Sequence, residues 1–404
     1  MLSGGERGCV VKFGETFSCN EYKMIRMTPA LAKMLCRSSA GESKPSSCFG
    51  NNNTALRGLE IKGDYRNQNA VVCTSDETFD LRKQESTNAQ LLLSPCSLSA
   101  LNETKAGGGR TVHLAGSTTF HFEPTKCVPR LDQLRALMKE CEFDDQDSEN
   151  GASKAGYTTT QLRERVQASD AEIASGLETI GAFQVEEAKG KPWRVLRDSY
   201  ARSAFDMVMS VIVGESMPLD AVSEGAIVAC LSGDYPPFVV RHVLKSHSSA
   251  RSESNADTLW TLDPVRVARA KATHMLSSEN VSAVMCIKTQ KMVQVVAVGA
   301  FVSAWKDSLP PGLPQVDLDM RGIAIKREIN SRMCYIPVRD NDLPLDAAKR
   351  FAHLFAISSR WTMEELSPYM VAVAGKETKQ QEKMLRKYAR FARGADGSRY
   401  FCKR

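Results

Sequence analysis

The sequence predicts an α+β protein in which a β-barrel-like N-terminal region is followed by tandem winged-helix domains. Three observations predict this fold class. Short β-type runs separated by polar turns fill residues 58–123. Pairs of helix-start signals recur further along the chain. Residues 376–404 hold ten Lys or Arg against three Asp or Glu, a balance of +7 in a chain whose net charge is +6. The rest of the chain therefore sums to −1, and the positive charge is local.

The N-terminal region is predicted to be a sheet of short strands. We expect these strands at residues 58–63, 70–74, 78–82, 89–93, 110–115 and 117–122. A sheet of about six short strands either closes on itself or leaves edges that must be covered. The region is therefore either a small self-contained barrel or a half-barrel that another chain completes.

Polar stretches rich in Ser, Asn and Gly interrupt the chain at residues 37–54, 102–109, 144–156 and 246–257. Such segments cannot bury enough apolar surface to order themselves, so we expect surface insertions. The third follows a predicted helix at residues 131–141, which puts a domain boundary near residue 150. The predicted domains are a β-rich partner-binding region with its connecting helix, a first winged helix, a middle winged-helix-like domain and a C-terminal winged helix, at residues 1–150, 151–215, 216–325 and 326–404.

The first winged helix is predicted from two capping boxes, in which a hydroxyl and a Glu or Gln three residues later satisfy free amides at a helix start. Thr158 with Gln161 and Ser169 with Glu172 fit this pattern, and two short β-type runs joined around a glycine follow them. The second of these helices contains no Lys or Arg, so a phosphate backbone would repel it. Its acidic residues are Asp170, Glu172 and Glu178. We expect this helix to bind protein or only to pack.

Two more helix pairs are predicted downstream. In the middle domain, helices are expected at residues 218–231 and 236–246, because a Pro-Pro step is tolerated at a helix start. In the C-terminal domain, a helix is expected to begin at Thr362 and to stop near Gly375, and another to begin at Thr378 and to stop near Gly394. A strand at residues 398–402 would complete the winged helix.

The second C-terminal helix is predicted to have a positive face. Its six cations fall within about a third of a turn at roughly 100° per residue. The residues expected on the opposite, apolar side are Met384, Leu385, Tyr388, Phe391 and Ala392. Neutralised phosphates release condensed counterions, so such a face suits nucleic acid of any sequence; the plainer interpretation is a solvated face. With a further cation on the following strand, the candidate DNA-binding residues are Lys379, Lys383, Arg386, Lys387, Arg390, Arg393 and Arg399.

No sequence motif predicts an enzyme, a metal site or a membrane span. Neither Gly-Lys pair continues into a phosphate-binding loop, no HExxH sequence occurs, and we identify no catalytic residue, metal ligand or cofactor site. The apolar runs are too short for a bilayer, and we expect no export signal. The twelve cysteines contain no CxxC pair and are expected to be reduced, mostly buried thiols. Asp317 and Asp319 alternate with apolar residues, which predicts a strand edge.

Several strings in the sequence resemble a known family. They are VVCTSDETFDLR at residues 71–82, ESTN at 85–88, LLL at 91–93, RFAHLF at 350–355, RWTMEEL at 360–366, LRKYAR at 385–390 and RYF at 399–401. In this order they closely resemble the Dcc-type sister chromatid cohesion proteins, from about residue 20 to the end of the chain.

The resemblance implies a non-catalytic subunit of an alternative, replication-factor-C-type clamp loader of the chromosome-transmission-fidelity class. That nuclear complex handles the sliding clamp in DNA replication and sister chromatid cohesion. In the family, the N-terminal β region joins two partner subunits in a composite barrel, which with the first winged helix docks on the leading-strand DNA polymerase. The C-terminal winged helices bind DNA, and contact with the sliding clamp is indirect. The partner-binding residues implied here are Val71, Val72, Cys73, Thr74, Thr78, Phe79, Leu81, Leu91, Leu92 and Leu93.

The alternative function is a free-standing winged-helix regulator of transcription, which the basic helix alone would allow. Such a regulator reads base edges and discriminates between sites, whereas phosphate contacts only position a protein on DNA. Equal affinity for unrelated duplexes would exclude this alternative.

Overall fold

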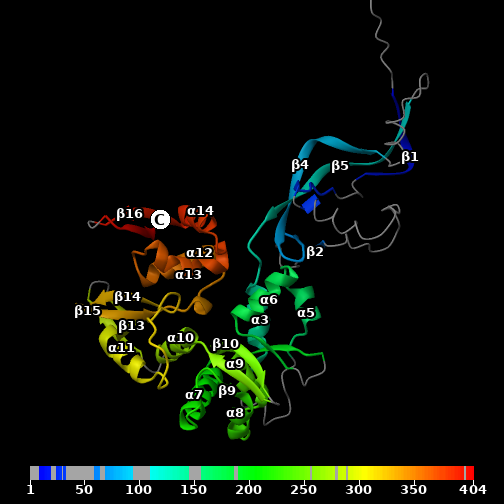
Figure 1. Ribbon diagram of the computed structural model, residues 1–404. Helices are drawn as coiled ribbons and strands as arrows, with labels where there is room; N and C mark the ends of the chain where they lie inside the picture. The colour runs from blue at the N-terminus through cyan, green and yellow to red at the C-terminus, as the bar shows by residue number, and fades with distance from the viewer. Residues whose placement is uncertain are drawn as a thin grey trace, which may run out of the picture. The chain divides into compact units, whose positions relative to one another are not determined.

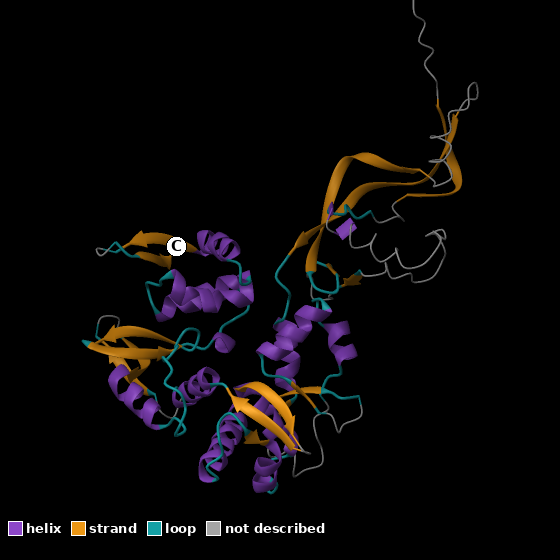
Figure 2. Cartoon of the chain, viewed as in Figure 1, coloured by secondary structure: helices purple, strands orange, loops and turns teal. Residues whose placement is uncertain are grey.

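The computed structural model describes residues 9–19, 24–29, 31–32, 59–63, 69–93, 110–144, 156–185, 190–254, 257–277, 281–287, 290–394 and 397–404. The chain divides into two compact units, residues 1–134 with 160–176, and residues 135–159 with 177–404. Figure 1 labels many of the helices and strands, and Figure 2 colours the chain by type of secondary structure. The predicted insertions at residues 37–54 and 102–109 lie outside the described residues, as does most of the insertion at 144–156.

A five-stranded sheet with the order β1-β5-β4-β3-β2 forms the frame of the first unit. Its two longest strands run antiparallel beside each other (Figure 2), whereas β1 pairs with β5 in parallel. The bounds are β1 (Cys9–Cys19), β2 (Glu60–Lys62), β3 (Val71–Cys73), β4 (Thr78–Leu93) and β5 (Arg110–Lys126). Because β1 and β2 form the two edges, the described strands do not close into a barrel. The prediction of a self-contained barrel was therefore wrong for this part of the chain, and the half-barrel that another chain completes stays a prediction.

The prediction of separate short strands was also wrong between residues 78 and 122. Residues 78–93 form one strand and residues 110–126 another, although polar residues interrupt both. The pairing register shifts between Glu85 and Gln90, and again between Leu92 and Leu93. A β-bulge absorbs extra residues without ending a strand, so turn-like composition did not produce turns here.

The apolar core of the first unit covers only one end of β4. Leu31, Leu59, Val72, Phe79 and Leu81 form this core, and each is at most 7% exposed. From Arg82 onward most side chains of β4 are exposed. The far half of the β4–β5 ribbon therefore has little core of its own.

Three helices follow the sheet in sequence, as predicted, the last two from their helix-start signals. They are α3 (Asp132–Glu140), α5 (Thr159–Arg165) and α6 (Asp170–Thr179). The predicted capping box at the start of α6 is confirmed: the Ser169 amide donates to Glu172 Oε2 at 3.0 Å, and the Glu172 amide donates to Ser169 Oγ at 3.3 Å. The predicted hairpin is confirmed as an antiparallel pair, and its second strand also pairs in parallel with β6. These strands are β6 (Glu142–Phe143), β7 (Phe183–Gln184) and β8 (Trp193–Leu196).

Residues 198–262 of the second unit form three helices and a sheet with the order β10-β11-β9. The bounds are α7 (Asp198–Gly214), β9 (Val222–Ser223), α8 (Glu224–Leu231), α9 (Pro237–His247), β10 (Ser248–Ser254) and β11 (Asp257–Leu262). The predicted helix at residues 236–246 is confirmed, with Pro236 as N-cap and Pro237 in the first turn of α9. The helix predicted at residues 218–231 is shorter than expected and begins at Glu224, because Val222 and Ser223 form β9. The insertion predicted at residues 246–257 forms β10 instead, because pairing with β11 satisfies its backbone and Arg251 lies 5.5 Å from the centre of the Trp260 ring.

Residues 264–337 combine two helices with a sheet of order β12-β13-β15-β14. The bounds are α10 (Pro264–Met275), β12 (Ser282–Cys286), β13 (Lys291–Ala297), α11 (Val298–Asp307), β14 (Ala324–Ile329) and β15 (Arg332–Pro337). The strand predicted around Asp317 and Asp319 is not formed. Asp319 lies in a loop instead, where its Oδ1 atom is 2.9 Å from Arg321 Nε.

The C-terminal elements surround a core in which Trp361 is fully buried. The bounds are η2 (Asp340–Asp342), α12 (Ala347–Ile357), α13 (Met363–Ala374), α14 (Thr378–Tyr388), β16 (Ala389–Arg393) and β17 (Arg399–Lys403). Trp361 forms an isolated β-bridge with Phe401, which ties β17 to the segment between α12 and α13. The predicted capping box of Thr362 and Glu365 is confirmed, and α13 stops at Gly375 with φ +75°.

Two predictions for α14 were wrong. The helix ends at Tyr388 instead of continuing to Gly394, because Ala389 begins a strand that pairs with β17 and is itself only 7% exposed. Its N-cap is Glu377, and Gln381 makes no capping box. The Gln381 side chain is instead buried, where it donates to the Gly375 carbonyl at 2.8 Å and accepts from the Ser367 hydroxyl at 2.9 Å.

Candidate nucleic-acid interface

The orientation of α14 is fixed by the side that it buries. Leu385 is 1% exposed, and Met384 and Tyr388 pack against the same core. The Tyr388 ring stacks on Phe351 with 5.3 Å between ring centres. These contacts confirm the predicted apolar side for Met384, Leu385 and Tyr388, so the opposite side of the helix faces solvent.

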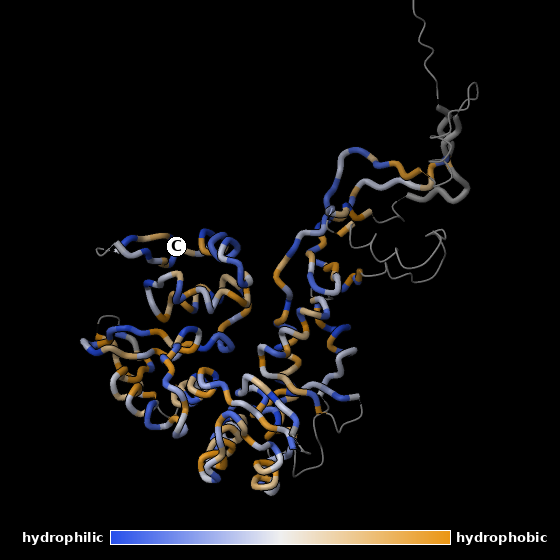
Figure 3. Tube along the Cα trace, in the orientation of Figure 1, coloured by the Kyte–Doolittle hydropathy of each residue, from blue (hydrophilic) through white to orange (hydrophobic). Residues whose placement is uncertain are grey.

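All seven candidate DNA-binding residues are exposed, but they come from three elements and not from one helix. Lys379, Lys383, Arg386 and Lys387 belong to α14, which is strongly hydrophilic in Figure 3. Arg390 and Arg393 belong to β16, and Arg399 to β17. We call these seven residues the cationic set. The hairpin β16–β17 therefore continues the positive charge beyond the end of the helix.

The hairpin holds two of these cations directly opposite each other. Arg393 pairs with Arg399 in the register of β16 and β17, at the end nearest the turn. Like charges directly opposite in an antiparallel pair destabilise it, because their side chains are neighbours on one face. An anion bound between them would remove that cost.

Within the described residues, no carboxylate forms an ion pair with any member of the cationic set. Another helix followed by a hairpin, α9 with β10 and β11, differs in this respect. There Arg241 Nε lies 2.8 Å from Glu224 Oε1, and Arg251 Nη2 lies 3.4 Å from Glu253 Oε1. Exposed cations that lack internal counter-charges attract polyanions at long range. The C-terminal cations are therefore the better candidates to meet phosphate.

Two further cations at this end were not chosen from the sequence. Lys403 is exposed at the base of the hairpin, opposite Ala389. The Arg404 guanidinium donates to the carbonyls of Arg386 and Lys387 at 3.5 and 3.4 Å, where helix carbonyls are otherwise free. Lys403 would have been added to the candidate residues if the pairing of β17 with β16 had been recognised in the sequence.

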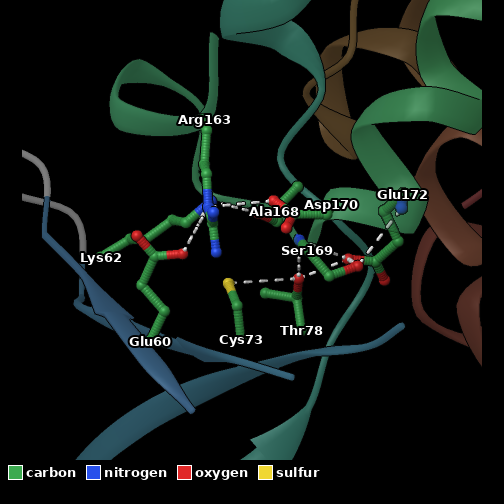
Figure 4. A network of polar contacts seen from close by, with 9 residues as sticks. All are labelled: Glu60, Lys62, Cys73, Thr78, Arg163, Ala168, Ser169, Asp170 and Glu172. Carbon is green, nitrogen blue, oxygen red and sulfur yellow. Dashed lines mark hydrogen bonds and ion pairs between the residues drawn. The ribbon is translucent and has the colours of Figure 1, made fainter. Parts of the chain in front are cut away.

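A buried polar network in the first unit explains the acidic start of α6 (Figure 4). Thr78 is fully buried, and its hydroxyl donates to Glu172 and accepts from the Ser169 amide at 3.0 Å. On the same side, Lys62 Nζ donates to the Ala168 carbonyl at 2.7 Å. Because Glu172 closes both a helix cap and a strand contact, it is not a free charge on the surface.

The surroundings of this network are also paired. Arg163 Nε lies 3.2 Å from both Glu60 and Asp170 carboxylate oxygens (Figure 4). Cys73 Sγ lies 3.7 Å from Thr78 Oγ1, and burial raises the pKa of this thiol. A thiol with a raised pKa is a poor nucleophile at neutral pH.

Comparison with known proteins identifies the family. The family model described as "Sister chromatid cohesion protein Dcc1" matches residues 22–370, most of the chain. The chain belongs to the sister chromatid cohesion protein Dcc1 family. The mouse (Mus musculus) protein named "Sister chromatid cohesion protein DCC1" is 25% identical over 374 residues, covering 92% of this chain and 84% of its own. The frog (Xenopus laevis) and yeast (Saccharomyces cerevisiae) proteins of the same name are 24% and 22% identical, covering 94% and 91% of this chain and 88% and 93% of their own.

The match to the Dcc1 family model ends at residue 370, before α14 begins. The cationic set lies beyond this match. Its assignment to DNA therefore depends on its own geometry and charge.

The ten partner-binding residues implied by the Dcc1 resemblance occupy two different environments. Seven are at most 7% exposed and lie inside this chain: Val71, Val72, Cys73, Thr74, Thr78, Phe79 and Leu81. The other three lie at the far end of β4, where Leu91 is 57% exposed and Leu92 and Leu93 are partly exposed. Only the far end of β4 presents these side chains to another protein.

The described residues contain no cluster of three or more His, Cys, Asp or Glu that suits a metal ion. In the same part of the chain, no helix combines the length and the apolar character that a membrane span requires.

Proposed function

We propose that this Dcc1-family protein is a non-catalytic subunit of an alternative, replication-factor-C-type clamp loader. It would act in the nucleus on the sliding clamp, in DNA replication and sister chromatid cohesion. Family membership and the cohesion names of the relatives support this assignment. The observation that carries the DNA-binding part is the cationic set, which has no carboxylate partner among the described residues.

The C-terminal elements would bind DNA as a winged helix. The order of α12, the bridge at Trp361, α13, α14 and the hairpin β16–β17 is the order that such a domain requires. In this arrangement α14 enters or crosses a groove and the hairpin lies along the backbone. Each neutralised phosphate releases counterions, so affinity would fall steeply with salt and depend little on sequence.

The N-terminal sheet would bind the two partner subunits through the far half of the β4–β5 ribbon. This half has exposed apolar residues such as Leu91 and little core of its own. The edge strands β1 and β2 offer backbone groups to which a further strand can add. The composite, with the elements around α5 and α6, would then dock on the leading-strand polymerase.

One experiment tests both parts with the intact chain. The tagged protein is recovered from nuclear extract, and the proteins bound to it are identified. Its affinity for unrelated DNA duplexes is then measured at low and at moderate salt. We expect the clamp-loader subunits among the bound proteins and equal, salt-sensitive affinity for the duplexes. Strong preference for one duplex would instead indicate a sequence-specific regulator, and absence of clamp-loader subunits would contradict the proposed complex.

A further inference from the structure

The hairpin β16–β17 exposes a large apolar ring among its cations. The sequence predicted that Phe391 would face the core on the same helix side as Leu385. In the structure it lies on β16 and is 53% exposed. Among the phenylalanines whose side chains the structure describes, only Phe13 and Phe391 are more than half exposed. Exposing an apolar ring to water is unfavourable, so a ligand that covers the ring would bind with a favourable hydrophobic contribution.

The ring of Phe391 is supported from behind. Phe391 lies opposite Phe401, and the two rings meet edge to face with 6.3 Å between their centres. Phe401 packs against the core, and its backbone exchanges hydrogen bonds of 2.8 and 3.1 Å with Trp361. The exposed ring is therefore carried by a strand that is anchored to the domain.

Cations lie beside this ring on the same face of the hairpin. Side chains two residues apart on a strand point to the same side, so Phe391 and Arg393 share a face. Arg399, opposite Arg393, belongs to that face as well. A ligand seated on the ring would thus meet two guanidinium groups toward the turn.

These features together select one class of ligand. A phenyl ring has no polar atom with which to read base edges or bind phosphate, but it stacks on the flat face of a base. In a duplex those faces are covered by neighbouring base pairs, whereas unpaired nucleotides present them. The paired arginines supply the positive charge that the flanking phosphates require.

We propose that the hairpin β16–β17 binds unpaired DNA, with one base stacked on Phe391 and adjacent phosphates held by Arg393 and Arg399. This inference rests on the DNA-binding function proposed above and specifies its ligand. Under it, α14 contributes phosphate contacts to any DNA, and the hairpin adds affinity only where a base is free.

The test measures binding of the full-length protein to a fluorescent oligo-dT strand and to a blunt duplex of equal length. Phe391→Leu keeps an apolar side chain against Phe401 but removes the aromatic face. We expect it to bind oligo-dT about tenfold more weakly, the size of one lost stacking contact, and to bind the duplex as the wild type does. Phe391→Trp is expected to keep or increase the affinity for oligo-dT. The matched control is Phe13→Leu, at the other exposed phenylalanine, which should change neither affinity.

A direct readout accompanies the affinities. Ultraviolet cross-linking to an oligo-dT strand that carries 5-iodouracil is expected to attach the base to Phe391, as located by mass spectrometry of the peptides. Circular dichroism of Phe391→Leu should match the wild type, so that a binding loss is not a folding loss.

The outcomes separate this inference from the function on which it rests. If the wild type binds neither probe at low salt, DNA binding itself is excluded. If the wild type binds both but Phe391→Leu weakens them equally or not at all, the stacking contact is wrong while DNA binding stands. Recovery of a protein ligand lost on Phe391→Leu, with oligo-dT affinity unchanged, would assign the ring to a protein contact and overturn the inference.

Discussion

Arg393 and Arg399 lie directly opposite each other across the hairpin β16–β17, although both carry a positive charge. A pair of like charges weakens the hairpin when no anion is bound. The same pair increases the attraction for phosphate, so stability and ligand affinity oppose each other at this position.

The first prediction follows from that opposition. Arg399→Glu converts the repulsive pair into an attractive one and should raise the stability of the free protein by about 0.2–1 kcal/mol. The same change should lower DNA affinity, because it removes a phosphate contact and adds repulsion. Thermal unfolding and DNA titration of the same sample measure both effects. A variant that loses stability as well would show that Arg399 has a structural partner.

The second prediction concerns phosphate contact by α14 and β16. The double change Arg386→Ala with Arg390→Ala should weaken binding to every DNA sequence and flatten the slope of log affinity against log salt by about two units. The matched control removes Arg241 and Arg251, which are ion-paired elsewhere in the second unit, and should leave the slope unchanged. An unchanged slope in the first double variant would move the DNA contact away from these residues.

The third prediction tests the buried network of the first unit. Glu172→Ala leaves the Thr78 hydroxyl and the Ser169 amide without their shared acceptor, and both residues are fully buried. We expect a loss of about 1–3 kcal/mol in unfolding free energy with DNA affinity unchanged. Glu178→Ala, at an exposed position of the same helix, is the control and should affect neither quantity.

The fourth prediction separates partner binding from folding. Leu91→Asp changes an exposed side chain on β4, so the protein should remain folded but bind its partner subunits more weakly. Leu81→Asp would place a charge in the core, and the first unit should unfold. Pull-down and circular dichroism of both variants measure the difference. Normal partner recovery with Leu91→Asp would exclude the far end of β4 as the contact.

The fifth prediction is a loss of stability in mild acid. Burial lowers the pKa of His242 and of His274 to about 4, from an ordinary value of 6.5. Between about pH 4 and pH 6.5, both histidines are therefore mostly neutral in the folded protein, whereas in the unfolded chain they are mostly protonated. Their contribution is fully present above pH 6.5 and is lost as the pH falls toward 4, at up to about 1.4 kcal/mol per pH unit for each histidine. Denaturant unfolding at several pH values measures this, and His242→Gln should reduce the dependence.

Local signals in the sequence predicted local structure well. The capping boxes at Ser169 with Glu172 and at Thr362 with Glu365 form as expected, because each needs only residues three positions apart. Gly375 ends α13 for a similarly local reason, since its backbone adopts a left-handed conformation. Such features depend little on the rest of the chain.

Features that depend on distant pairing were not predictable in the same way. Helical spacing placed Phe391 with Leu385, but the pairing of Ala389 with Lys403 ends the helix before that residue. In the same way, β4 continues past residue 86 because its pairing with β5 resumes at Gln90 after a shift of register. The cations of the candidate DNA site were identifiable from composition, whereas the opposition of Arg393 and Arg399 required the register.

The contact of Thr78 with Glu172 also has a consequence during protein synthesis. These residues are 94 positions apart, so the ribosome releases the strand well before the carboxylate that it needs. Until residues 169–172 emerge, the Thr78 hydroxyl has water as its partner, and the polar network of the first unit is incomplete. The network at the front of this protein must therefore wait for a segment translated much later.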